Sequence, residues 1–157
     1  MNAVRYFVET CLVDDEDDVH VILVNEQRGV FIPLFIELRH CASLLRVLRD
    51  EDSDEDVMTW SFVMGSWIKL GFQPVSIVLD YQGDQGILVP CMTFLQNQAD
   101  RSFVYITTII PMGSAVTSSV LMNIPLYITE KAESVVKRLD LTKLKEYIEQ
   151  ISSKETE

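Results

Sequence analysis

A stretch of small and hydroxyl-bearing residues between two apolar segments is the first candidate for chemistry in this sequence. In "IIPMGSAVTSSVLMNIPLYI" a β-branched run ends at Pro111, and Gly113 and Ser114 open a predicted helix. The backbone N–H groups and the dipole at a helix start attract anions. Gly113 and Ser114 therefore form a candidate anion-binding pair. Ser114 has no base nearby in the sequence to make it a nucleophile, and a serine at this position most often caps its helix.

The spacing of the histidine and cysteine residues gives little further indication of a catalytic site. His40 and Cys41 adjoin on a predicted helix, where neighbouring side chains diverge by about 100° and cannot act on one point. Cys41 also lies on the apolar stripe of that helix, which favours a buried, inert thiol. His20 follows the acidic run "DDEDD", which indicates a solvated pairing with one of its carboxylates.

Alternating carboxylates at Asp50, Asp52 and Asp54 raise the question of a calcium loop. An EF-hand then needs glycine at its sixth position and glutamate at its twelfth. Those positions hold Glu55 and Ser61, so the match fails and a solvated acidic loop is favoured. The sequence contains no Walker, dinucleotide-binding, zinc or Gly-x-Ser-x-Gly motif.

Composition sets the class of protein. The 157 residues suit one domain, and the 48% hydrophobic content indicates a globular chain. The net charge is −11, but two runs at 14–18 and 50–56 hold eleven of the 24 acidic residues, and the remainder balances the 13 basic ones. No Lys or Arg cluster suggests sequence-independent phosphate binding.

The length of the apolar runs, the N-terminal sequence and the cysteine spacing bear on membrane association and location. No apolar run reaches the ~18 residues of a membrane span, so no membrane partner is expected. "MNAVRYFVETCLV" carries an Arg and a Glu in its apolar stretch and does not read as a signal peptide. Three cysteines without metal-ligand spacing fit a reducing compartment, so a cytoplasmic location is expected.

The elements that would position these residues alternate between period 2 and period 3.6. Strands are predicted at 4–13, 19–24, 30–36, 74–82, 87–95, 102–110 and 124–128, and helices at 37–49, 60–71, after Pro111 and at the C-terminus. Thr59 would cap the second helix and Gly71 would end it. Pro33 suggests an edge strand or a bulge. Leu141, Leu144, Ile148 and Ile151 form a narrow apolar seam on the last helix.

Together, these elements predict a mixed α+β domain in which two groups of strands share a sheet system covered by helices. We assign residues 1–136 to this domain and residues 137–157 to a C-terminal amphipathic helix and tail.

The order of elements and four short stretches resemble the bifunctional nuclease domain family of bacteria. "IPLFIE" (32–37) is similar to its Leu-Pro-Ile-Trp-Ile-like strand, and "MTWSFV" (58–63) stands where its Thr-His-Asp-Leu-like helix begins. "KLGFQPVSIVLDYQGDQG" (69–86) matches its Leu-Gly helix end and hairpin, and "PLYI" (125–128) matches its last strand. The resemblance covers about residues 3–136 and implies the family's fold.

The resemblance also implies a chemistry, the hydrolysis of DNA or RNA assisted by Mg²⁺ or Mn²⁺. It places Asp80 at an acidic family position, Thr59 at the Thr-His-Asp-like site and His40 where relatives often carry an acid. The family's Arg-Pro-Ser-Asp-Ala falls on residues 111–115, which here read Pro-Met-Gly-Ser-Ala. Because a metal-assisted nuclease needs carboxylates or imidazoles, these replacements indicate a degenerate, weakly active or inactive member.

Three functions stay open. The first is a metal-dependent nuclease with Asp80, His40, Ser114 and Thr59 as catalytic candidates, whose nucleic-acid partner rests on the resemblance. The second is a non-catalytic homo-oligomeric protein-interaction module, favoured by the strand "VFIPLFI" and by the C-terminal seam, both of which suit self-association. The third is an anion sensor at Gly113 and Ser114.

Overall fold

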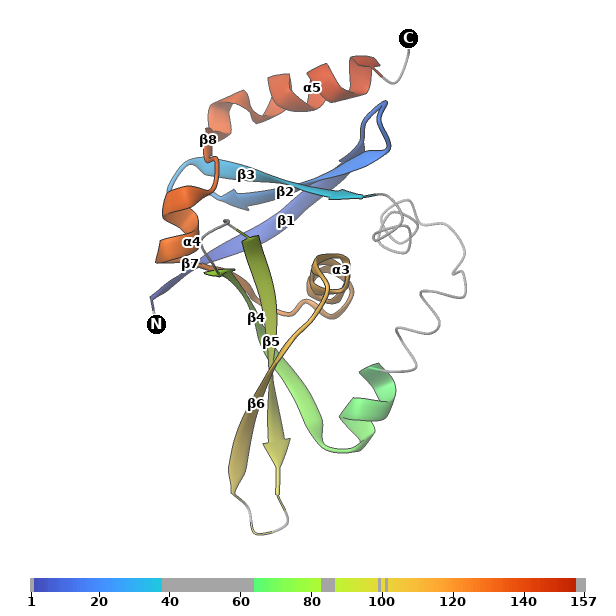
Figure 1. The fold of residues 1–157 in the computed structure, drawn as a ribbon, viewed down its shortest axis with the longest axis vertical. Helices are drawn as coiled ribbons and strands as arrows, with labels where there is room; N and C mark the ends of the chain where they lie inside the picture. Colours follow the sequence, from blue (N-terminus) through green and yellow to red (C-terminus); the bar gives the residue numbers. More distant parts are fainter. Residues whose placement is uncertain (1, 38–63, 83–86, 99, 101, 155–157) are drawn as a thin grey trace.

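The computed structural model describes residues 2–37, 64–82, 87–98, 100 and 102–154. Its strands form one mixed eight-stranded sheet with helices packed against it, which confirms the α+β class (Figure 1). The strands are β1 (Ala3–Val13), β2 (Asp18–Asn25), β3 (Val30–Glu37), β4 (Phe72–Gln82), β5 (Ile87–Asn97), β6 (Phe103–Ile109), β7 (Leu126–Thr129) and β8 (Leu139–Asp140). The helices are α3 (Met112–Met122), α4 (Glu130–Val135), α5 (Leu144–Lys154), the 3₁₀ turn η2 (Leu141–Lys143) and a helical segment at 64–69.

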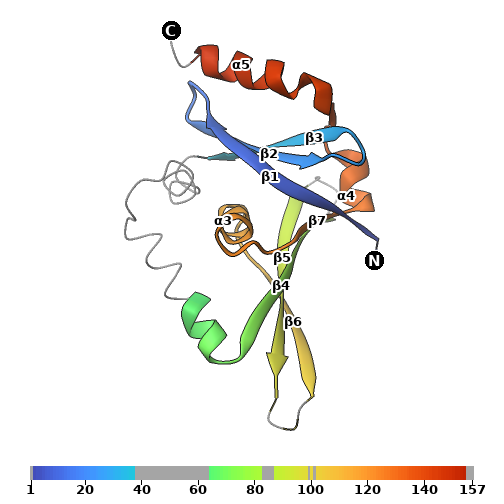
Figure 2. The ribbon, with the colours of Figure 1, turned by 180° about the vertical axis from the view of Figure 1, so that it is seen from behind.

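Two antiparallel meanders are joined through one short strand. The strand order is β6-β5-β4-β7-β1-β2-β3-β8, with β7 antiparallel to β1 and parallel to β4. The predicted groups of strands, β1–β3 and β4–β6, are therefore confirmed. Seen from both sides, the β5–β6 hairpin projects away from the rest of the fold (Figures 1 and 2).

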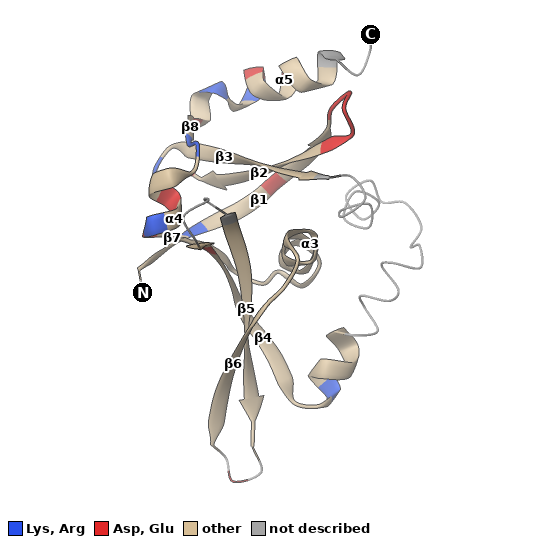
Figure 3. Ribbon diagram, viewed as in Figure 1, with Lys and Arg blue, Asp and Glu red and all other residues tan. Residues whose placement is uncertain are grey.

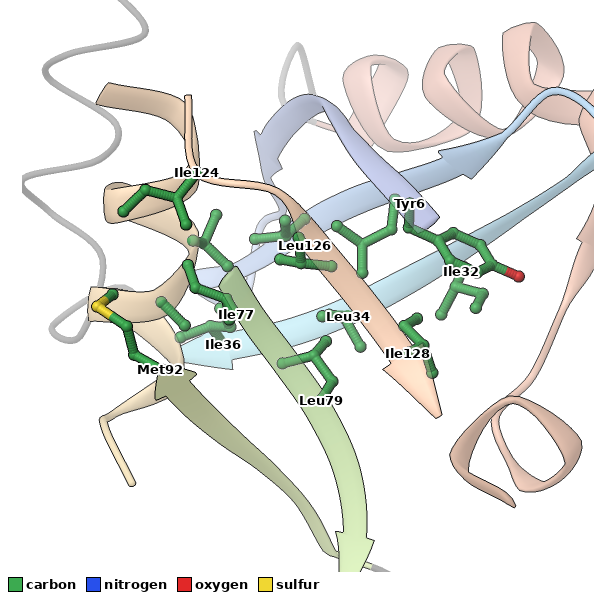
Figure 4. Close-up of a cluster of buried hydrophobic side chains, with 14 of the residues drawn as sticks. Tyr6, Ile32, Leu34, Ile36, Ile77, Leu79, Met92, Ile124, Leu126 and Ile128 are labelled. Carbon is green, nitrogen blue, oxygen red and sulfur yellow. The ribbon is translucent and has the colours of Figure 1, made fainter. Parts of the chain in front are cut away.

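The main core lies between the inner side of β1–β3, the strands β4 and β7, and helix α3 (Figure 4). β2 is buried along almost its whole length because both of its faces are covered. Val19, Val21 and Leu23 point into the main core, while Ile22 and Val24 point to the other side. A strand buried on both faces reads as a continuous apolar run, as "VHVILV" does.

A second, smaller core forms where the C-terminal segment covers the outer side of β2 and β3. Ile22, Val24 and Phe31 pack there against Leu139, Leu141, Leu144 and Tyr147. Part of the C-terminal seam thus contacts the chain's own sheet, and Ile151 is buried as well. Part of this seam is therefore occupied within the chain, but Leu141, Leu144 and Ile148 also line a hollow at the surface, so a role in self-association stays a prediction.

Turn residues behave as their types require. Gly29 (φ 63°) and Gly71 (φ 89°) occupy the left-handed region that favours glycine, and the second confirms the predicted end of the helix at Gly71. Asn123 (φ 55°) ends α3 in the same way. Pro33 lies in β3 opposite Ile22 without a register shift, and β8 pairs only with Val30 and Phe31. Among the described strands, Pro33 therefore stands on an edge and not at a bulge.

Several predictions lie outside the described residues, namely the helix at 38–49, the start of the helix at 60–71, the second acidic run and residues 83–86 of the hairpin. The predicted start of the first of these helices at Glu37 is wrong, because Glu37 is the last residue of β3 and pairs with Asp18. The elements α4 and β8 are not among those predicted from sequence, and both are short. None of the described helices is long and apolar enough to cross a membrane.

Candidate functional site

Asp80, the acidic position singled out by the family resemblance, lies half-buried near the end of β4. Its Oδ1 accepts hydrogen bonds from the Thr129 hydroxyl (2.8 Å) and from the Tyr81 backbone N–H (2.8 Å). Thr129 is the N-cap of α4, where its hydroxyl oxygen accepts from the Ala132 N–H (3.2 Å). Asp80 thereby orients the hydroxyl that begins α4, which is a structural task for this carboxylate.

The thiol of Cys91 is close to Asp80 on the same face of the sheet. Burial, with a smaller contribution from the Asp80 carboxylate, raises the pKa of the Cys91 thiol. The thiolate form is therefore disfavoured, and Cys91 is a poor nucleophile.

Ser114 and Gly113 occupy the first turn of α3. The N-cap of this helix is Pro111 and no side chain caps it, so the prediction that Ser114 caps the helix is wrong. Pro111 already has the extended backbone conformation that an N-cap residue needs. The helix therefore begins before Ser114, which lies three residues beyond the N-cap. Gly113 is buried, and its carbonyl accepts a hydrogen bond from the Thr117 hydroxyl (2.7 Å).

Ser114 lines a hollow of about 290 Å³ between the helical segment at 64–69, the strands β5 and β6, and the start of α3. Its other lining residues include Trp67, Met92, Phe94 and Ile110, and none of the lining residues is charged. Trp67 packs against Phe94 with ring centroids 5.1 Å apart. Such an apolar lining offers an anion no positive side chain, so the anion-binding role of Gly113 and Ser114 stays a prediction.

The sheet separates the candidates that the structure describes. Asp80 alternates with the buried Leu79 and so points to the face opposite the core. Ser114 shares its hollow with Met92 and Phe94, which point to the core face. Asp80 and Ser114 therefore cannot act on one bond. Thr59 and His40 lie outside the described residues.

No group of three or more His, Cys, Asp or Glu side chains suited to a metal ion occurs within the described part of the chain.

Two clusters of polar side chains are buried elsewhere in the fold. His20 is only 7% exposed and bridges Asp14 (Nε2 to Oδ2, 2.7 Å) and Tyr147 (Nδ1 to the hydroxyl, 2.9 Å). The pairing with the acidic hairpin is confirmed, but the expectation that it is solvated is wrong, because α5 covers the imidazole. A hydrogen bond from His20 holds the pKa of Asp14 below its usual value, while burial raises the pKa of Tyr147.

Glu133 is the second buried polar centre. Its carboxylate accepts from the Tyr6 hydroxyl (2.6 Å) and from Arg28 (2.7 Å), and Arg138 lies 3.6 Å away. Burial raises the pKa of Tyr6, so the hydroxyl keeps its proton and remains a donor. Both clusters have satisfied partners and tie distant segments together, which indicates structural roles.

An unusual surface is the uncharged part of the side of the β4–β5–β6 meander that faces away from the core; Asp80 lies beside it on the same side, near the end of β4. We call this uncharged part the outer face. It consists of Val78, Cys91, Thr93, Leu95, Phe103, Tyr105, Thr107 and Ile109. Each of these residues is half-buried or exposed, and Thr93 and Thr107 share a hydrogen bond across it (3.0 Å). β5 and β6 carry no charged residue, as Figure 3 shows in tan.

This surface is not among the features predicted from sequence, although the sequence contains a signal for it. "FVYITTI" is a strand without charge, proline or glycine, and the exposed fractions of Phe103, Tyr105 and Ile109 are 63%, 68% and 64%. Edge strands usually carry charges, prolines or bulges that prevent pairing with another chain. β6 has none of these, and no described strand pairs with its far edge.

No family model matches this chain, and no curated protein matches it. Membership in the bifunctional nuclease domain family, which the motifs indicate, accordingly stays a prediction.

Proposed function

We propose that this chain is a non-catalytic protein-interaction module that assembles with itself through the β4–β5–β6 meander. The observation that carries the proposal is the outer face together with β6, which are uncharged in a chain of net charge −11. A large exposed apolar surface on a charged protein is typical of an interaction site. Repulsion between two copies is smallest where neither presents a charge.

The separation of Asp80 from Ser114 supports the non-catalytic part of the proposal. Asp80 is engaged in starting α4 through Thr129, and Ser114 lines an apolar hollow on the other side of the sheet. Neither has a described partner that would activate water or a nucleophile.

The molar mass of the wild-type chain, measured by light scattering over a wide concentration range, tests the assembly. We expect twice the chain mass of 18.0 kDa at high concentration, falling on dilution. A mass of one chain at every concentration would remove the proposal.

Metal-assisted cleavage of nucleic acid is the second candidate, supported by the motif resemblance and by Asp80 at its acidic position. A cleavage assay on supercoiled DNA and structured RNA, scanned over Mg²⁺ and Mn²⁺, separates the two. We expect no cleavage above that of an Asp80→Asn preparation. Cleavage that requires a metal and is lost in Asp80→Asn would favour the nuclease.

A further inference from the structure

The free edge of β6 presents the backbone groups of its odd-numbered residues. The Ile110 N–H donates to the Pro90 carbonyl (3.1 Å), and the Gln98 N–H donates to the Ser102 carbonyl (3.0 Å). Hydrogen-bonded pairs alternate along an antiparallel ladder, so the even-numbered residues of β6 bond to β5. The N–H and C=O groups of Phe103, Tyr105, Thr107 and Ile109 therefore point away from the sheet.

We infer that β6 pairs antiparallel with β6 of a second copy, about a two-fold axis at Ile106. This inference rests on the proposed self-association and specifies its geometry. The register sets Phe103 opposite Ile109 and Tyr105 opposite Thr107, so all seven residues of the strand overlap. The residues of both pairs are odd-numbered, so their N–H and C=O groups point away from β5. In this register the outward-pointing groups of one copy hydrogen-bond to those of the other.

The same register also places apolar side chains of the two copies opposite each other. Residues directly opposite in an antiparallel pair lie on the same face, and the outer faces of the two copies thus join into one. The exposed ring of Phe103 meets the exposed Ile109 at both ends of the strand. The two meanders become one continuous sheet across the axis.

The tip of the hairpin carries one acidic and one basic residue, Asp100 and Arg101, and so adds no net charge to this pairing. Continuing the register carries the turn at Asp100 toward the first turn of α3 in the second copy. That turn contains no acidic residue and no side-chain cap, and the positive end of the helix dipole favours a carboxylate nearby. The acidic runs of the chain lie elsewhere in the sequence, at 14–18 and 50–56.

The area available is that of a modest interface. With about 200 Å² for an aromatic side chain, Phe103 and Tyr105 expose on the order of 250 Å² per copy. A standard interface uses roughly 800 Å² per partner. The strand backbone, Ile109 and the rest of the outer face must supply the remainder, so a dimer that dissociates on dilution is expected.

A pair of double variants tests the register. Phe103→Lys with Ile109→Glu places a lysine opposite a glutamate at both ends of the paired strands. Phe103→Lys with Ile109→Lys changes the same positions but places like charges opposite each other. Within one chain the two positions are six residues, roughly 20 Å, apart, where salt screens their interaction. A difference between the variants must therefore arise between copies.

Light scattering on both variants and on the wild type gives the dissociation constants. We expect the Lys/Lys variant to dissociate at least about tenfold more readily than the Lys/Glu variant, since opposite and like charges across a strand pair differ by this order. Net charge alone predicts the reverse, because Lys/Lys lowers the magnitude of the overall negative charge. Equal constants in a dimeric protein would overturn the β6 register but leave self-association standing. A monomeric wild type would overturn both.

Discussion

At the residue scale, buried charged and polar side chains form small clusters in which they hydrogen-bond to one another. Glu133 is 4% exposed and is satisfied by Tyr6 and Arg28, which lie 127 and 105 residues away in sequence. His20 lies beside the acidic hairpin that precedes it, so its pairing with an acid could be predicted. Its second partner, Tyr147, could not be predicted, because only the packing of α5 on β2 and β3 brings the two together.

The Asp14 carboxylate should stabilise the fold in a pH-dependent way. Its pKa is below the usual value of about 3.9, so its contribution is complete above that value and is lost as the pH falls through the lowered pKa. We expect Asp14→Asn to lower the free energy of unfolding at neutral pH, and the difference from wild type to narrow in acid.

Asp15→Asn is the matched control, because Asp15 is exposed in the same turn and its substitution changes the net charge equally. Denaturant unfolding followed from neutral pH down to about pH 3 checks the prediction. An Asp14→Asn effect of the same size throughout this range, or one equal to that of Asp15→Asn, would show that the bond to His20 contributes nothing.

At the scale of elements, strands with strong β-branched content could be predicted from sequence and short elements could not. β1–β7 follow the predicted segments because each has an apolar run or alternation. α4 has six residues, and its start depends on Thr129 being held by Asp80 from a different strand. β8 has two residues and exists because β3 lies beside it. Tertiary contacts decide such elements.

The alternation along β6 predicts unequal effects of proline at neighbouring positions. The Thr108 N–H points toward Met92 of β5, so Thr108→Pro removes a ladder hydrogen bond. The Thr107 N–H points away from the sheet, where proline is tolerated. We expect Thr108→Pro to lower the free energy of unfolding by about 2–3 kcal/mol, and Thr107→Pro to lower it by less than about 1 kcal/mol.

Chemical denaturation at a concentration where the chain is monomeric measures this difference without a contribution from assembly. Equal decreases in the free energy of unfolding, or a larger decrease for Thr107→Pro, would contradict the assignment of the even-numbered residues of β6 as those that hydrogen-bond to β5.

At the scale of the whole molecule, the candidate site depends on which face of the sheet each residue occupies. Sequence alone groups Asp80 and Ser114 through a family motif, whereas the fold sets them on opposite faces. The order of the strands, with β7 inserted between the two meanders, follows from no local pattern. It leaves β6 at one end of the sheet, which makes an uncharged segment an edge.

A single cysteine at the proposed two-fold axis tests the assembly through β6 most directly. Residues opposite each other in a non-hydrogen-bonded pair have Cα atoms about 4.5 Å apart, within the range of a disulfide. Ile106→Cys would face its own copy there, whereas Thr108→Cys would face Val104. Mild oxidation followed by non-reducing electrophoresis gives the result, with the wild type as control for the three native cysteines. We predict a disulfide-linked dimer for Ile106→Cys alone, and cross-linking of neither variant, or of both equally, would contradict the account.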